Sequence, residues 1–117
     1  MERDDKVYVH NIIDAIVSVE SFIQGINTVD DFVKPENKKT QSAVIRELEV
    51  IGEAAKQLTE RFRSRESELP WGKIVAMRNK LMHEYWDIDL RIVWKTIYDH
   101  LDILKRTLLE YLKEHGE

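Results

Sequence analysis

The sequence of 117 residues contains no cysteine. This absence excludes a disulfide framework and a thiolate zinc site, and it fits the reducing conditions of the cytoplasm. The charged N-terminus, Met1–Lys6, leads into no apolar run of the kind found in signal peptides. No window of the sequence approaches the length of a membrane-spanning segment. We therefore expect a cytoplasmic protein with no membrane partner.

The sequence also lacks strand-like alternation, internal repeats and low-complexity linkers. Its composition, 43% hydrophobic and 34% charged residues, is typical of a soluble, helix-rich globular protein. A chain of this length forms one domain and can bury a hydrophobic core without disulfides or a structural metal. We expect a single domain over residues 1–117.

Apolar residues recur at three- and four-residue spacing over most of the chain, which predicts amphipathic helices. The expected long helices cover residues 4–26, 37–64, 70–84 and 90–114, and a short capped helical turn covers 28–32. Short connections between such helices favour an all-α fold, an antiparallel four-helix bundle with a short extra helix.

Three of these helices have well-defined apolar stripes. In the last helix Asp89 is the expected N-cap, and the expected inner stripe is Leu90, Val93, Trp94, Ile97, Leu101, Leu104, Leu108 and Leu112. In the first helix the expected stripe is Val9, Ile12, Ile13, Ile16, Val17, Phe22 and Ile23. In the second helix the near-heptad seam is Val44, Leu48, Ile51, Ala55, Leu58 and Phe62. Gly52 lies inside this second helix, where glycine costs about 1 kcal/mol relative to alanine. We expect a neighbouring helix to approach closely there.

The net charge of −4 argues against a broad nucleic-acid interface. The charge is unevenly distributed, because residues 1–35 carry a net −4 and residues 71–95 a net +2. Any RNA contact must therefore be local or be built from more than one chain. The run Arg61, Arg63 and Arg65 is either a solvated helix end or a second candidate for RNA contact.

Chemically distinctive residues gather at 78–85, where Arg78, Asn79, His83 and Tyr85 fall within eight residues. Arginine can bind a phosphate with two parallel hydrogen bonds, and histidine transfers protons near pH 7. RNA cleavage without a metal needs such proton transfer and a cation for the charged transition state. On a helix, however, Arg78 and His83 lie about 140° apart. They converge only if the arginine wraps round, the helix loosens, or two copies meet across a two-fold interface.

The residues alone leave an ordinary structural interpretation open. In that interpretation Arg78 forms a salt bridge with a glutamate, His83 is a hydrogen-bonded helix-end residue and Tyr85 belongs to the core. Glu53 could face the motif from the second helix and orient Arg78 or His83, or it could be a solvated side chain. The other histidines have no metal-ligand spacing, so we expect no metal and no cofactor.

The segment Arg78-Asn79-x-x-x-His83-Glu84-Tyr85 resembles the Arg-polar-x-x-x-His-x-Tyr signature of the HepT toxins, a branch of the HEPN superfamily. The resemblance extends to the segment 42–56, to Pro70-Trp71 and to residues 93–97, and so to nearly the whole chain. It implies an all-α, HEPN-like homodimer that acts as a metal-independent endoribonuclease in a toxin–antitoxin pair.

The resemblance also implies roles for individual residues. Arg78 and His83 would be catalytic, with Asn79 supporting them. A minimal nucleotidyltransferase antitoxin would transfer AMP to Tyr85 and so silence RNA cleavage. The alternative is a non-catalytic helical module that binds a nucleotide, RNA or the nucleotidyltransferase partner.

Overall fold

A computed structural model describes residues 2–83 and 88–115, with the backbone alone at 2–4, 82 and 83. The chain forms α1 (Glu2–Phe22), α2 (Val29–Phe32), a 3₁₀ turn (Pro35–Asn37), α3 (Lys38–Gln57), α4 (Glu60–Arg65), α5 (Trp71–His83), α6 (Leu90–Thr96), a π-helical turn (Ile97–Leu101) and α7 (Asp102–Glu114). There is no strand in the described ranges, which confirms the all-α expectation.

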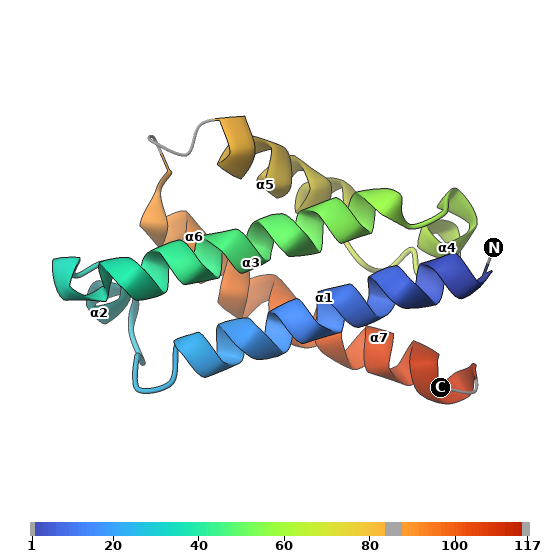
Figure 1. Cartoon of the computed structure of the whole chain (residues 1–117), viewed down its shortest axis with the longest axis horizontal. Helices are drawn as coiled ribbons and strands as arrows, with labels where there is room; N and C mark the ends of the chain where they lie inside the picture. Colours follow the sequence, from blue (N-terminus) through green and yellow to red (C-terminus); the bar gives the residue numbers. More distant parts are fainter. Residues whose placement is uncertain (1, 84–87, 116–117) are drawn as a thin grey trace.

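Helix α3 is the central element of the bundle. Its most extensive packing is against α1 on one side and α5 on the other. Figure 1 shows α3 between these two helices, with α6 and α7 behind them. The motif helix α5 is therefore positioned mainly by α3. Within the described parts of the chain, no helix is long and apolar enough to cross a membrane.

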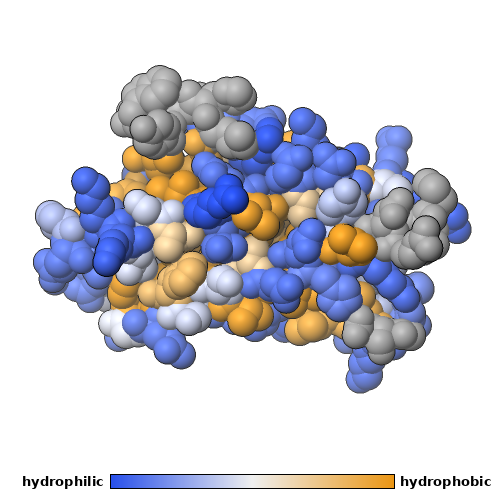
Figure 2. All heavy atoms as spheres, in the orientation of Figure 1, coloured by the Kyte–Doolittle hydropathy of each residue, from blue (hydrophilic) through white to orange (hydrophobic). Residues whose placement is uncertain are grey.

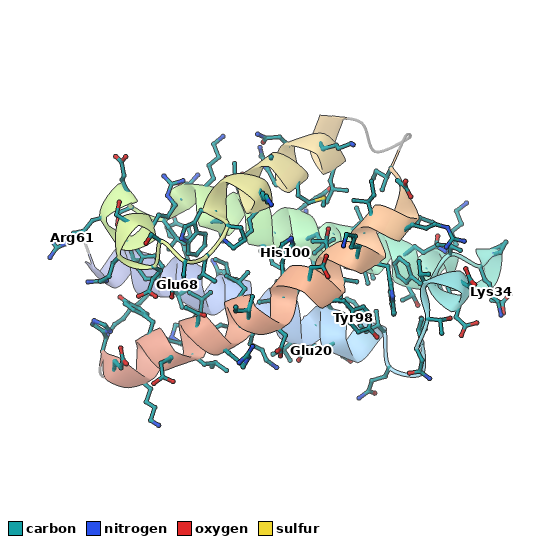
Figure 3. All side chains as sticks on the ribbon, turned by 180° about the vertical axis from the view of Figure 1, so that it is seen from behind. Glu20, Lys34, Arg61, Glu68, Tyr98 and His100 are labelled. Atoms are coloured by element: carbon teal, nitrogen blue, oxygen red, sulfur yellow. The ribbon has the colours of Figure 1, made fainter. Side chains whose placement is uncertain are left out.

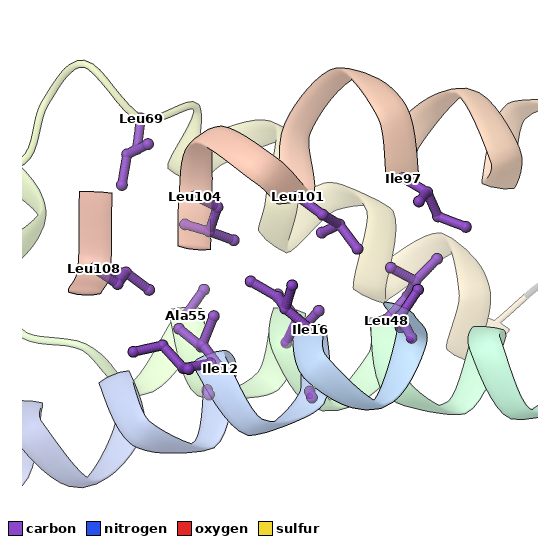
Figure 4. Packing of buried hydrophobic residues seen from close by; sticks show 14 of the residues in the cluster. Ile12, Ile16, Leu48, Ala55, Leu69, Ile97, Leu101, Leu104 and Leu108 are labelled. Carbon is purple, nitrogen blue, oxygen red and sulfur yellow. The ribbon is translucent and has the colours of Figure 1, made fainter. Parts of the chain in front are cut away.

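The hydrophobic core lies between the α1–α3 pair and the α6–α7 segment. Figure 4 shows Ile12 and Ile16 of α1 and Leu48 and Ala55 of α3 opposite the leucines of α7. The whole predicted seam of the second helix is buried: Val44, Leu48, Ile51, Ala55, Leu58 and Phe62. The first-helix stripe is only partly correct, because Val17 and Phe22 are exposed.

The expected helix over 37–64 is in fact two helices. α3 ends at Gln57, Leu58 is extended, and Thr59 begins α4 by accepting a hydrogen bond from the Phe62 backbone N–H at 3.1 Å. This break is stabilised by a residue that lies outside the segment 37–64. Asp5 of α1 accepts from the backbone N–H and the hydroxyl of Thr59, at 2.9 and 2.8 Å. A periodic apolar pattern cannot reveal a break that a distant carboxylate stabilises.

The expected helix over 90–114 is likewise interrupted, by the π-helical turn. Asp89 caps its start as expected, accepting from the Arg91 backbone N–H at 2.9 Å. Just before the turn, the Thr96 hydroxyl donates to the Ile92 carbonyl at 2.9 Å, an interaction that bends helices. Of the predicted inner stripe, Leu90 is half-buried and all the other members are buried.

Asp5 gives the first testable prediction. Its side chain is only 2% exposed, and Asp5→Ala leaves the Thr59 donors without their partner. Leaving a buried hydrogen-bonding group unpaired costs about 1–3 kcal/mol, so we expect that loss in the free energy of unfolding measured by urea denaturation. Asp14→Ala, an exposed aspartate on the same helix, is the matched control and should change stability little. Equal midpoints for the two variants would contradict the assignment.

Candidate active site on helix α5

Arg78 lies in the middle of α5, and its guanidinium group turns towards α3. Nη2 of Arg78 is 2.8 Å from Oε1 of Glu53, and the Arg78 side chain is only 16% exposed against 47% for Glu53. The second carboxylate oxygen of Glu53 accepts from Nε2 of Gln57 at 3.1 Å. The structure thus brings Arg78 and Glu53 together and holds the guanidinium at the outer edge of the α3–α5 contact.

Gly52 explains why the two helices come so close. A Cβ added at Gly52 would overlap Cβ of Arg78 and lie 2.8 Å from its Cγ and 3.2 Å from its Cα. Glycine is therefore the residue that lets the backbone of α3 approach the Arg78 position. The expectation of a close approach at Gly52 is confirmed, and the neighbour is the motif arginine itself.

Asn79 is exposed, and its side chain supports Arg78 directly. Nη1 of Arg78 donates to Oδ1 of Asn79 at 2.9 Å. The guanidinium is thus held between Glu53 on α3 and Asn79 on α5. Its Nε is buried and has no hydrogen-bond partner in the part of the chain that the structure describes.

His83 and Tyr85 can be placed only in part. α5 remains α-helical through His83, so the roughly 140° offset between positions 78 and 83 is that of a regular helix. The His83 side chain and the whole of Tyr85 lie outside the described residues. The catalytic role of His83 and the modification of Tyr85 therefore stay predictions.

Helix α4, which carries the run Arg61, Arg63 and Arg65, lies away from the motif. Helix α4 lies near the start of α5, far from its His83 end (Figure 1), and the Arg61 side chain points outward at that end of the molecule (Figure 3). The Arg65 guanidinium carbon lies 5.8 Å from the ring centroid of Phe62 and 5.4 Å from that of Tyr111. A cation–π contact of this kind gives Arg65 a structural role.

The surface around Arg78 is mixed in character. On the face formed by α1, α3 and α5, Figure 2 shows hydrophilic residues interspersed with hydrophobic ones. In the described ranges, no group of three or more histidine or acidic side chains could hold a metal ion. The chemistry available at Arg78 is therefore that of a fixed cation flanked by a carboxylate and an amide.

Comparison with known proteins identifies the family. The family model "Ribonuclease HepT-like" matches residues 12–111. A Thermococcus cleftensis protein named "Probable ribonuclease HepT" is 42% identical over 90% of this chain and 93% of its own length. "Putative RNase TTE0752" of Caldanaerobacter subterraneus subsp. tengcongensis is 36% identical over 96% of this chain and 97% of its own.

A third relative is longer than this chain. "Gamma-glutamylcyclotransferase and putative RNase MJ0434" of Methanocaldococcus jannaschii is 34% identical over 97% of this chain, which spans 50% of that protein. No solved structure gives a significant match. The family match covers most of the chain and includes α5 with its Arg78–His83 segment, and the chain belongs to the HepT-like ribonuclease family.

Proposed function

We propose that this protein is a metal-independent endoribonuclease in which Arg78 and His83 carry out cleavage. The observation that supports this most is the fixed guanidinium of Arg78, held 2.8 Å from Glu53 and 2.9 Å from Asn79 in a chain of a ribonuclease family. A preorganised cation costs no reorganisation when charge develops on the phosphate. Glu53 and Asn79 act as positioning residues.

The proposed reaction is attack of a ribose 2′-oxygen on the adjacent phosphorus. The 2′-hydroxyl loses its proton to a base as the new P–O bond forms. The bond to the 5′-oxygen breaks, and that oxygen leaves with a proton from an acid. His83 supplies proton transfer at neutral pH, and Arg78 stabilises the charged phosphoryl oxygens.

The helical offset between Arg78 and His83 favours a homodimer as the working unit. A two-fold interface would bring a second motif to the same phosphate. An apolar cavity of about 290 Å³ between α5 and α6, lined partly by Met77, Ile92 and Val93, supports this proposal. Ile92 is 46% exposed, so part of this apolar lining is available to a second copy of the chain.

Regulation is proposed to involve Tyr85 and a minimal nucleotidyltransferase that forms a toxin–antitoxin pair with this protein. AMP transfer to the Tyr85 hydroxyl forms a phosphodiester bond and releases pyrophosphate from ATP. The added group brings negative charge and bulk two residues beyond His83, and negative charge competes with RNA phosphate for the motif arginine.

The test is RNA cleavage in EDTA by protein made without its partner, after intact-mass measurement confirms that it is unmodified. We expect cleavage by the wild type and none above background by His83→Ala. Cleavage abolished by EDTA and restored by a divalent metal would overturn the metal-independent mechanism. A His83→Ala protein that cleaves as fast as the wild type would overturn the proposed site.

The alternative of a non-catalytic binding module makes the opposite forecast. Unmodified wild type would then bind RNA or the nucleotidyltransferase without cleaving, and binding would survive His83→Ala. Adding purified nucleotidyltransferase and ATP tests the regulatory part separately. We expect mass increments of AMP on the wild type and none on Tyr85→Phe.

A further inference from the structure

A cavity of about 320 Å³ lies beside Arg78, on the outer face of the bundle. Helix α1 lines it with Tyr8 and Asn11, α3 with residues that include Arg46, Glu49 and Glu53, and α5 with Arg78. This is the face on which α3 lies between α1 and α5 (Figure 1). Its volume is at the lower end of the range for small-molecule sites, which suits one nucleotide and not a folded partner.

The side chains that line the cavity differ in how strongly other residues of the protein hold them. Arg78 is held by Glu53, whereas Arg46 is 74% exposed and its Nη1 lies 4.0 Å from Oε1 of Glu49. Tyr8 is half-buried and packs against the core cluster, so its ring is anchored from below. Asn11 is exposed and offers both a donor and an acceptor.

The charges in the cavity argue against a second phosphate. The two arginines are matched by two carboxylates, Glu49 and Glu53. With Arg78 assigned to the phosphate, the remaining groups are an aromatic ring, an amide, a carboxylate and one solvated guanidinium. Single-stranded RNA is recognised by this combination, in which a base stacks on an aromatic ring and its edge is hydrogen-bonded.

We propose that the cavity formed by Tyr8, Asn11, Arg46 and Glu49 beside Arg78 binds the nucleoside adjacent to the RNA phosphate held by Arg78. This inference rests on the proposed RNA cleavage and adds a substrate subsite to it. Tyr8 stacks on the base, and Asn11 and Glu49 contact its polar edge. Glu49 accepts from an exocyclic amino group, so the site favours adenine, cytosine or guanine over uracil.

The test begins with binding, which does not depend on cleavage. Titrations of 5′-CMP, 5′-UMP and inorganic phosphate, followed by amide NMR shifts, should place the nucleotides at Tyr8 and Asn11, with 5′-CMP binding more tightly than 5′-UMP. Tyr8→Leu should weaken 5′-CMP binding about tenfold through lost stacking, and Tyr8→Phe should retain it. Phosphate that binds as tightly as 5′-CMP would reduce the site to a simple anion site and overturn the proposal.

Cleavage kinetics supply the second readout. Arg46→Gln should raise KM for RNA several-fold with little change in kcat, as expected when binding of the ground state and of the transition state is weakened equally. Arg106→Gln is the matched control, because Arg106 is 68% exposed on α7 and pairs with Asp102. Equal effects of the two substitutions, together with normal cleavage by Tyr8→Leu, would overturn the subsite and leave the nuclease proposal standing. Nucleotide binding at Tyr8 and Asn11 by a wild type that does not cleave RNA would overturn the nuclease proposal and leave the subsite standing.

Discussion

Replacing Arg78 with alanine is expected to slow RNA cleavage by about 10²–10³-fold, the usual cost of removing a preorganised group that stabilises transition-state charge. The cleavage rate of the Arg78→Lys variant is expected to fall nearly as far. Lysine keeps the charge but lacks the planar fork that binds a phosphate through two parallel hydrogen bonds. Single-turnover cleavage of a labelled RNA, with each variant of verified unmodified mass, gives the rates.

The fold should survive the Arg78→Ala change. Alanine keeps the Cβ that fits against Gly52, so the α3–α5 contact is unaltered. The lost ion pair is partly buried, with Arg78 16% and Glu53 47% exposed. Water can replace the guanidinium at Glu53, and we expect a cost of about 1–2 kcal/mol. A large drop in stability would show that the arginine acts in folding and would remove the catalytic interpretation of the slow rate.

Arg91→Ala is the matched control for this experiment. Arg91 is an exposed arginine whose Nη2 lies 3.1 Å from Oδ1 of Asp30, so its removal deletes the same charge and an ion pair that is more exposed than that of Arg78. It lies on α6, outside the motif. We expect near-wild-type cleavage from Arg91→Ala, and a loss equal to that of Arg78→Ala would indicate a general electrostatic effect on RNA binding.

The sequence was sufficient for the fold wherever the information was local. The seam from Val44 to Phe62 and the Asp89 cap were readable because apolar spacing and capping residues act over a few positions. The breaks at Leu58 and in the π-helical turn were missed. The first depends on Asp5, which is distant in sequence. The second begins beside the Thr96 hydroxyl that bonds the Ile92 carbonyl, a feature that apolar periodicity does not contain.

For the candidate site, too, local features could be predicted from the sequence and long-range ones could not. The motif stood out by its residue types, and Glu53 was identified as a possible partner of Arg78. The nucleoside subsite was not predicted, because Tyr8 and Asn11 lie on a different helix and reach Arg78 only through the packing of α1 on α3. Such a juxtaposition depends on which helices are neighbours, and helical periodicity does not specify that.

Gly52→Ala is expected to destabilise the protein and to reduce cleavage, against the direction that helix propensity alone predicts. Alanine in a helix interior is favoured over glycine by about 1 kcal/mol. Here the new Cβ would overlap Cβ of Arg78. That atom is fixed to the backbone and cannot rotate away, so α3 and α5 must separate. Overpacking costs about 1–3 kcal/mol and occasionally more, and this overlap of two backbone-fixed atoms belongs at the upper end. After the gain in helix propensity, we expect a net loss of about 2 kcal/mol.

Gly72→Ala isolates the steric contribution. Gly72 lies in the first turn of α5, and a Cβ added there meets nothing within 4 Å. This control should be neutral or more stable by up to about 1 kcal/mol. Denaturant unfolding of the two variants should therefore give changes of opposite sign, and two stabilised proteins would contradict the close approach of α3 and α5.

The separation of α3 and α5 should also slow RNA cleavage, because moving α5 displaces Arg78 from Glu53. A misplacement of about 1 Å can cost about 10²-fold in rate, so we expect Gly52→Ala to approach Arg78→Ala in cleavage while it remains folded at low temperature. A double-mutant cycle with Arg78→Gly separates the two effects. Removing the Arg78 Cβ should restore much of the stability lost in Gly52→Ala but none of the cleavage, since space between the helices returns without the cation.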